Sequence, residues 1–282
     1  MIKLCAFADE ASSELMGQIT ALKRNNISLL ELRSINEKNV ADFSFDDAKN
    51  YKTQLDNEGI KVWSIGSPLG KVDINIDFNK YLDICKKVFE IANIMGTKNI
   101  RAFSFFNAYN DKNRVFDYLN KMSDIAKEYD VFLCHENEKE VYGDTLKRVK
   151  EIMANVRDWK YIYDPANFVQ CGEVADETLF QLFNKIYYFH IKDVISATDE
   201  MVPAGYGDGK IDKLVSMITD DKVLSIEPHL FTFDAYKNID NTEMKTKFKF
   251  RNNDEAFDAA VRGIKNILQK CNYNEEKYGF TT

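Results

Sequence analysis

Four residues that could bind a metal ion or move protons stand at the ends of four consecutive apolar runs. The runs end in FLCHENEKE, YIYDPANF, YYFHIKD and LSIEPHL, and the residues are Glu136, Asp164, His190 and Glu227. Converging carboxylates removed from water are costly unless they are paired or bind a metal. Three carboxylates and one imidazole form a mostly oxygen site that suits Mn²⁺, with Mg²⁺, Co²⁺ or Zn²⁺ as alternatives.

Each of these residues, taken singly, could equally be an ordinary polar residue at a strand end, solvated or salt-bridged. Their recurrence at equivalent positions of consecutive runs favours one shared metal site.

The chain holds only three histidines, so the direction of each side chain matters. Successive residues of a strand face opposite sides. If Glu136 faces inward, the preceding His135 points outward and is structural. His229 lies two residues after Glu227, beyond a proline, and two alternatives stay open for it: a substrate contact or a solvated loop histidine.

Short runs rich in β-branched or aromatic residues alternate with stretches of helical period, which is typical of βα units and a parallel sheet. The eight runs are Lys3–Ala8, Ser28–Leu32, Ile60–Ile65, Asn99–Ser104, Val131–Glu136, Lys160–Asp164, Ile186–Ile191 and Val223–Glu227. Segments such as SELMGQITALKRNN, NKYLDICKKVFEIANIMG and RVFDYLNKMSDIAKEY predict amphipathic helices between them. This order predicts an α/β fold, a (β/α)8 TIM barrel. No GxGxxG follows the first run, so an open dinucleotide-binding sheet is the weaker alternative.

Composition sets the wider limits. Of the 282 residues 45% are hydrophobic, which excludes a disordered chain, and no linker or repeat divides residues 1–282, so one domain is expected. The net charge of -7 gives no basic face for nucleic acid. No apolar run has the length of a membrane span or a signal peptide, and the five cysteines show no CxxC, so a cytoplasmic protein with reduced thiols is expected.

Several segments, in order along the chain, resemble the xylose isomerase-like TIM barrels. This sugar isomerase/epimerase group also includes inosose dehydratase-like and endonuclease IV-like proteins. The segments are AFADE, LLELR, GSPLGK, IRAFSF, HENEKEVYGDT, YDPANF, HIKD, GYGDGKID and IEPHL. The resemblance implies that Glu136, Asp164, His190 and Glu227 bind one divalent metal, and that Glu136 and Glu227 also act as an acid/base pair. Some members have histidines where this chain has Asn167 and Glu138, which leaves the substrate open.

The expected function is a divalent-metal-dependent isomerase or epimerase of a small sugar or sugar derivative, acting by proton transfer next to a carbonyl through an enediolate. A lyase that dehydrates a keto-inositol or a dehydroshikimate-type acid on the same site is one alternative. A non-catalytic barrel that binds sugar or metal is another. A trinuclear-zinc DNA repair nuclease is disfavoured, because three histidines are too few and the chain is acidic.

Six residues are candidates for substrate contact: Asn167, Lys192, Glu138, His229, Trp63 and Arg101. Lys192 could instead pair with Asp193 at the rim. For Arg101 a structural ion pair with Glu31 is favoured. Trp63, like Phe7, Phe103 and Phe105, either walls the substrate site or belongs to the core.

Two loops leave further alternatives open. PAGYGDGKID is either a flexible turn, which is favoured, or a phosphate-binding loop. The long segment from Pro228 to Asn253 is interpreted as a lid, a substrate loop or a contact in a homo-oligomer. Within it, Lys245, Lys247 and Lys249 alternate with apolar residues, which indicates either an edge-like hairpin strand or phosphate attraction.

Overall fold

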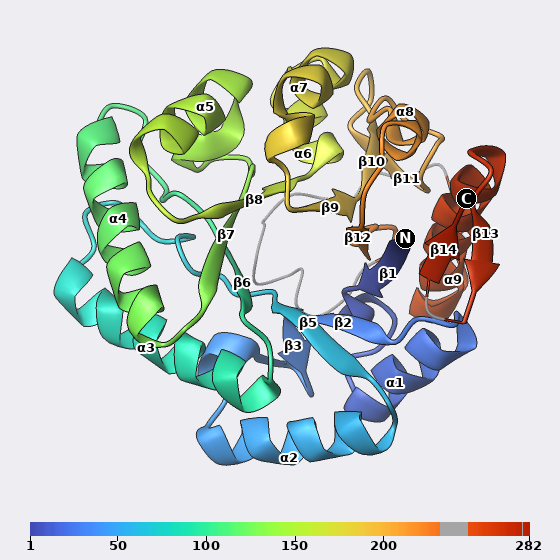
Figure 1. Cartoon of the computed structure of the whole chain (residues 1–282), viewed down its shortest axis with the longest axis horizontal. Helices are drawn as coiled ribbons and strands as arrows, with labels where there is room; N and C mark the ends of the chain where they lie inside the picture. The colour runs from blue at the N-terminus through green and yellow to red at the C-terminus, as the bar shows by residue number, and fades with distance from the viewer. Residues whose placement is uncertain (232–247, 278) are drawn as a thin grey trace.

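The protein is a closed barrel of eight parallel strands inside a ring of helices (Figure 1). The computed structural model describes residues 1–231, 248–277 and 279–282. The barrel strands are β1 (Ile2–Ala6), β2 (Leu29–Leu32), β5 (Lys61–Ile65), β6 (Asn99–Ala102), β7 (Phe132–Glu136), β8 (Lys160–Tyr163), β9 (Tyr188–Ile191) and β12 (Lys222–Ile226). Each pairs with the next, and β12 pairs with β1 from Ile2↔Lys222 to Ala6↔Ile226, which closes the sheet. The predicted TIM barrel is confirmed, with every predicted strand end within two residues of the observed one.

The helices cover the outside of the barrel. They are α1 (Leu15–Arg24), α2 (Phe45–Asn57), α3 (Phe78–Met95), α4 (Lys112–Glu128), α5 (Leu146–Asn155), α6 (Pro165–Gln170), α7 (Ala175–Leu182), α8 (Ile211–Ser216) and α9 (Asn253–Lys270), with short 3-10 turns η1 (Ala8–Glu10), η2 (Val40–Asp42), η3 (Tyr142–Asp144) and η4 (Phe183–Lys185). Local signals set their ends: Ser44 and Asp47 form a capping box on α2, and Gly96 ends α3 at a φ of 74°. None of the helices in the described part of the chain is long and apolar enough to cross a membrane.

Three short antiparallel hairpins, absent from the predicted elements, extend from the barrel. They are β3 (Ser34–Ile35) with β4 (Lys38–Asn39), β10 (Asp193–Ile195) with β11 (Glu200–Val202), and β13 (Asn274–Glu276) with β14 (Gly279–Thr281). The last one packs beside the start of β1, where Ile2 pairs with Phe280.

Side chains that point into the barrel form layers along its axis. Toward the amino-terminal ends of the strands, an apolar layer contains Cys5, Cys134, Ile162, Tyr188 and Val223, with Leu29, Trp63 and Tyr187 packed against it. Nearer the carboxyl ends the layer becomes polar, and it includes the fully buried Glu31 and His190. This polar layer leads into the candidate site.

Candidate active site

Four strands bring the predicted ligands to one point. Glu136 ends β7, His190 lies in β9, and Asp164 and Glu227 directly follow β8 and β12. One ligand atom of each residue lies within 4.8 Å of those of the others, and all four side chains are buried. The four predicted ligands therefore meet in space.

The outward direction expected for His135 is also observed. Its Nε2 lies 3.1 Å from the hydroxyl of Ser104, and its ring packs near Trp159 and Tyr161. Burial lowers the pKa of His135 to about 3, so its ring is neutral. The alternation along β7 thus separates a structural histidine from the neighbouring carboxylate of Glu136.

His190 lies among three carboxylates. Its Nδ1 is 3.1 Å from Glu136 Oε1 and 3.2 Å from Glu227 Oε2, and its Nε2 is 3.2 Å from Glu31 Oε2. Burial alone would lower the pKa of His190, but the charges of Glu136 and Glu31 outweigh it and raise the pKa well above its usual value. The imidazole therefore links the floor of the site to both candidate acid/base residues.

Glu31 fixes the orientation of this imidazole from below. Its carboxylate accepts hydrogen bonds from the hydroxyls of Tyr188 (2.7 Å) and Ser225 (2.6 Å) as well as facing His190 Nε2. A carboxylate behind a histidine keeps the proton on the ring nitrogen that faces the carboxylate. The other ring nitrogen is then left to bind a metal. Nδ1 is thus the nitrogen of His190 that faces Glu136 and Glu227 and could bind a metal.

The donor set fits a divalent cation. Asp164 Oδ2 and Glu227 Oε2 are buried and accept no well-formed hydrogen bond from the described residues, although ammonium and imidazole nitrogens lie nearby. Burial raises the pKa of Asp164 to about 6, with Glu136 and Glu227 adding to the rise against the opposing Lys192. A cation bound by three carboxylate oxygens and one imidazole nitrogen would offset this crowding of negative charge.

Arg33, at the end of the second barrel strand, belongs to the same buried network. Its guanidinium makes two contacts of 2.8 Å with the carboxylate of Asp9 and one of 2.8 Å with Glu227 Oε1, and it lies 3.3 Å from Glu10. The sequence does not predict Asp9, Glu10 and Arg33 as site residues. The signal was present, since AFADE and LLELR also carry charged residues after or within apolar runs.

Arg101 faces the site and forms a buried ion pair, as favoured from the sequence, but its partners differ from the expected Glu31. Its Nη1 lies 3.3 Å from both Glu136 Oε2 and Glu227 Oε1, whereas the sequence favoured an ion pair with Glu31. The guanidinium also lies over the ring of Phe7, 4.9 Å from its centre. Arg101 therefore bridges the two glutamates expected to move protons.

Lys192 likewise points into the site. Its Nζ is 2.8 Å from Asp164 Oδ2 and 3.9 Å from Glu227 Oε2, so the alternative of a rim salt bridge with Asp193 is wrong. Burial lowers the pKa of Lys192, but Asp164 and Glu227 outweigh burial and raise the pKa above its usual value. Lys192 is a buried cation next to two of the four candidate ligands.

Asp193, the first residue of β10, instead stabilises the glycine-rich loop that follows β11. Its carboxylate accepts the backbone N–H groups of Gly205, Gly207 and Gly209 at 2.9, 3.0 and 2.9 Å. A Cβ at Gly207 would lie 2.3 Å from Asp193 Oδ1. An internal carboxylate thus already occupies the N–H groups that a bound phosphate would need, and it also fixes the turn.

Asn167 and Glu138, which stand where some relatives have histidines, both lie near the ligands. Asn167 Nδ2 donates to Glu136 Oε1 (3.2 Å) and to the backbone of Asn137 (2.9 Å). Glu138 pairs with Lys71 at 2.7 Å. Burial raises the pKa of Glu138, but Lys71 and Lys192 outweigh it and lower the pKa to about 2. Asn167 contacts the candidate ligand Glu136 directly, whereas Glu138 pairs with Lys71 and is affected by the charge of Lys192.

His229 lies beside the ligands, whereas Trp63 does not. His229 Nε2 is 3.4 Å from Glu10 Oε1 and 3.6 Å from Glu227 Oε1, and burial lowers its pKa to about 4. Trp63 stacks on Tyr187 in the apolar layer, so it is part of the core and does not reach the four ligands.

The aromatic residues predicted to wall the site either lie near it or belong to the core. Phe7 and Phe103 lie beside Arg101, whereas Phe105 packs against Phe78 in the outer core. The long segment after β12 falls mostly on residues 232–247, and with it Lys245 and Lys247, which lie outside the described residues.

Comparisons with known proteins agree with this fold. A family model described as xylose isomerase-like TIM barrel matches residues 20–266. A probable 3-DHS dehydratase AsbF from Bacillus anthracis has a similar structure, with a TM-score of 0.72, 16% identity and coverage of 94% of this chain and 99% of that chain. An IolI protein with a bound zinc atom has a TM-score of 0.71 and 21% identity, with coverage of 95% of this chain and 98% of that chain. An L-ribulose 3-epimerase has a TM-score of 0.70 and 16% identity, with coverage of 96% of this chain and 95% of that chain. No curated protein matches.

Proposed function

The chain belongs to the xylose isomerase-like TIM barrel family, and from that premise we propose a divalent-metal-dependent isomerase or epimerase of a small sugar or sugar derivative. The observation that carries the proposal is the pair Glu136 and Glu227, both within 3.2 Å of the same nitrogen of His190. Two carboxylates that flank one point can remove a proton from a carbon and return it.

The chain's own residues would divide the work between them. A divalent cation bound by Glu136, Asp164, His190 and Glu227 would polarise a substrate carbonyl and make the neighbouring C–H more acidic. Burial raises the pKa of Glu227, but Lys192 and His190 outweigh it and hold the pKa well below its usual value, so this carboxylate is ionised, as a base must be. The proposal leaves the order of acid and base between the two glutamates open.

Neighbouring groups support the same assignment. Arg101 contacts both glutamates, so its charge would offset their mutual repulsion and limit their basicity. Asn167 on α6, and Glu138, Lys192 and His229 after β7, β9 and β12, are proposed to bind the substrate's oxygens. Mn²⁺ is the first metal to test, because three of the four ligands are carboxylates, and Zn²⁺ follows it.

Exchange of carbon-bound hydrogen with solvent tests the proposal. The purified chain, stripped with a chelator and reloaded with Mn²⁺, should incorporate solvent deuterium into at least one member of a panel of ketoses and inososes. Glu227→Gln should abolish the incorporation and keep the fold, because the amide cannot accept the proton. The matched control is Glu128→Gln on the exposed end of α4. Full exchange in Glu227→Gln would refute the acid/base assignment.

The same panel separates the competing functions. The likeness to a probable 3-DHS dehydratase supports a lyase as the second candidate, because dehydration also begins with proton removal next to a carbonyl. Loss of water from an inosose or a dehydroshikimate-type acid would favour the lyase. Metal-dependent sugar binding with no exchange would favour a binding protein.

A further inference from the structure

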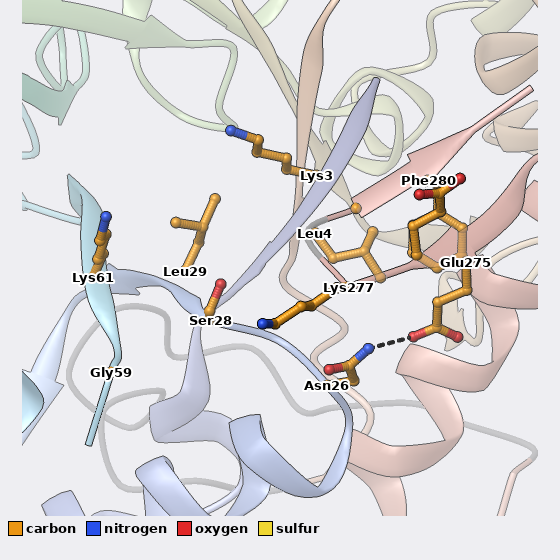
Figure 2. Close-up of a pocket in the computed structure, with 12 residues that line it drawn as sticks. Lys3, Leu4, Asn26, Ser28, Leu29, Gly59, Lys61, Glu275, Lys277 and Phe280 are labelled. Carbon is orange, nitrogen blue, oxygen red and sulfur yellow. Dashed lines mark hydrogen bonds between the residues drawn. The ribbon is translucent and has the colours of Figure 1, made fainter.

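The opposite end of the barrel holds a second hollow, remote from the proposed metal site. It has a volume of about 310 Å³ and lies between the first residues of the barrel strands and the C-terminal hairpin β13–β14 (Figure 2). Lys3 near the start of β1, Lys61 at the start of β5 and Lys277 on the hairpin line it, together with Asn26, Ser28 and Phe280. The metal ligands lie at the other ends of the strands, so the two sites are separate.

The lysines give this hollow a positive character in an acidic chain. Within the described residues, neither Lys3 nor Lys61 has a carboxylate at ion-pair distance, whereas many other surface lysines do. In Figure 2 the Lys277 side chain points from the hairpin toward Ser28, and Lys61 stands across the hollow.

The two acidic residues that line the hollow are already engaged. Glu275 accepts hydrogen bonds from Lys265 (2.6 Å) and Asn26 (3.1 Å), and Glu276 accepts one from Thr281 (2.8 Å). Lys265 offsets the charge of Glu275. The three lining lysines therefore outnumber the two lining glutamates.

The hairpin that closes the hollow is held tightly against β1. Gly279 has a φ of 152°, and a Cβ there would lie 2.5 Å from the carbonyl oxygen of Ile2, so only glycine permits this approach. The hairpin follows residue 266, where the family match ends. The hollow therefore depends on an element outside the part of the chain that the family model describes.

We propose that this hollow binds the phosphate group of a small phosphorylated molecule. A phosphate offers several acceptor oxygens to ammonium groups that approach from different elements, and lysine binds it as a point charge. The hydroxyl of Ser28 adds a further donor, and Leu4, Leu29 and Phe280 give an apolar wall for an organic part. The volume lies at the lower end of the range for ligand sites, which fits a small molecule.

Titration calorimetry with inorganic phosphate, at constant ionic strength set with chloride, tests the proposal on the full chain. We expect saturable binding whose dissociation constant rises at least about tenfold in Lys61→Gln/Lys277→Gln, because two charge-assisted contacts are lost. Lys270→Gln, an exposed lysine at the end of α9, is the matched control and should bind as the unmodified chain does. These lysines are exposed, so their replacement should leave the melting temperature unchanged.

A second variant separates this hollow from the metal site. Glu136→Gln should retain the phosphate affinity, because Glu136 lies at the carboxyl ends of the strands. Absence of saturable binding, or unchanged binding in the double lysine variant, would overturn the proposal. Its failure would say nothing about deuterium exchange at the metal site, so the two proposals stand or fall separately.

Discussion

Replacing Glu31 with glutamine tests whether the buried carboxylate below His190 tunes the metal site. The change keeps the shape of the side chain. The amide oxygen can still accept from Ser225 and His190, and the hydroxyl of Tyr188 can turn toward Ser64 Oγ, 3.2 Å away. The variant should therefore fold, and what it loses is the negative charge behind the imidazole.

Two opposing effects set the expected size of the change. Loss of a carboxylate behind a ligating histidine typically weakens metal affinity about 10- to 100-fold, or about 1.4–2.7 kcal/mol. Burial lowers the pKa of His190, but Glu136 and Glu31 outweigh it and raise that pKa, so a metal must displace a proton at neutral pH. Removing Glu31 lowers this pKa and relieves the competition. The affinity loss should thus be largest at high pH and narrow as the pH falls.

Calorimetric titration with Mn²⁺ between about pH 6 and about pH 9 measures both effects. The Mn²⁺ affinity of the unmodified chain should rise with pH until His190 loses its proton. The affinity of Glu31→Gln should level off at a lower pH and at a lower value. Glu128→Gln serves as the control, since its side chain is exposed on α4. Equal plateaus for Glu31→Gln and the unmodified chain, or a constant difference at every pH, would refute the role given to Glu31.

Two further predictions follow from buried charges. Lys192→Met removes the ammonium 2.8 Å from Asp164, so Mn²⁺ should bind about tenfold more tightly in calorimetry while deuterium exchange slows; unchanged exchange would place Lys192 outside the reaction. Burial lowers the pKa of His135 to about 3, against an ordinary value of 6.5, so its stabilising effect is complete above pH 6.5 and is lost as the pH falls toward 3. Between pH 6.5 and about pH 5 this should cost about 2 kcal/mol of unfolding free energy. Urea denaturation of His135→Gln should lack that slope, and an equal slope in both proteins would contradict the assignment.

The sequence predicts the barrel and the meeting of the four candidate ligands, because both depend on local periodicity. A strand that alternates faces and ends in a charged residue defines the direction of that residue, as the contrast between His135 and Glu136 shows. Parallel strands then bring their ends together at one rim without further information.

The contacts that these residues make depend on barrel closure and on depth along the barrel axis, and residue spacing in the sequence predicts neither. Arg33 meets Glu227 across 194 positions because β1 joins β2 to β12, and this follows from barrel closure alone. Trp63 shows a second limit: alternation gives the face of a residue but not its depth along the axis, and here that depth places the ring in the apolar layer. Depth and closure are properties of the assembled sheet.

The glycine-rich loop that Asp193 stabilises contains a position whose side chain can be changed while the backbone stays fixed. One carboxylate fixes the backbone on both sides of Tyr206 through the glycine N–H groups, whereas the Tyr206 side chain is 65% exposed and contacts only the ring of Phe248 among the described aromatic rings. Gly207 cannot vary, since a Cβ there would collide with Asp193. For a protein engineer, Tyr206 is therefore a position at which new side chains can be presented on a fixed scaffold without rebuilding the loop.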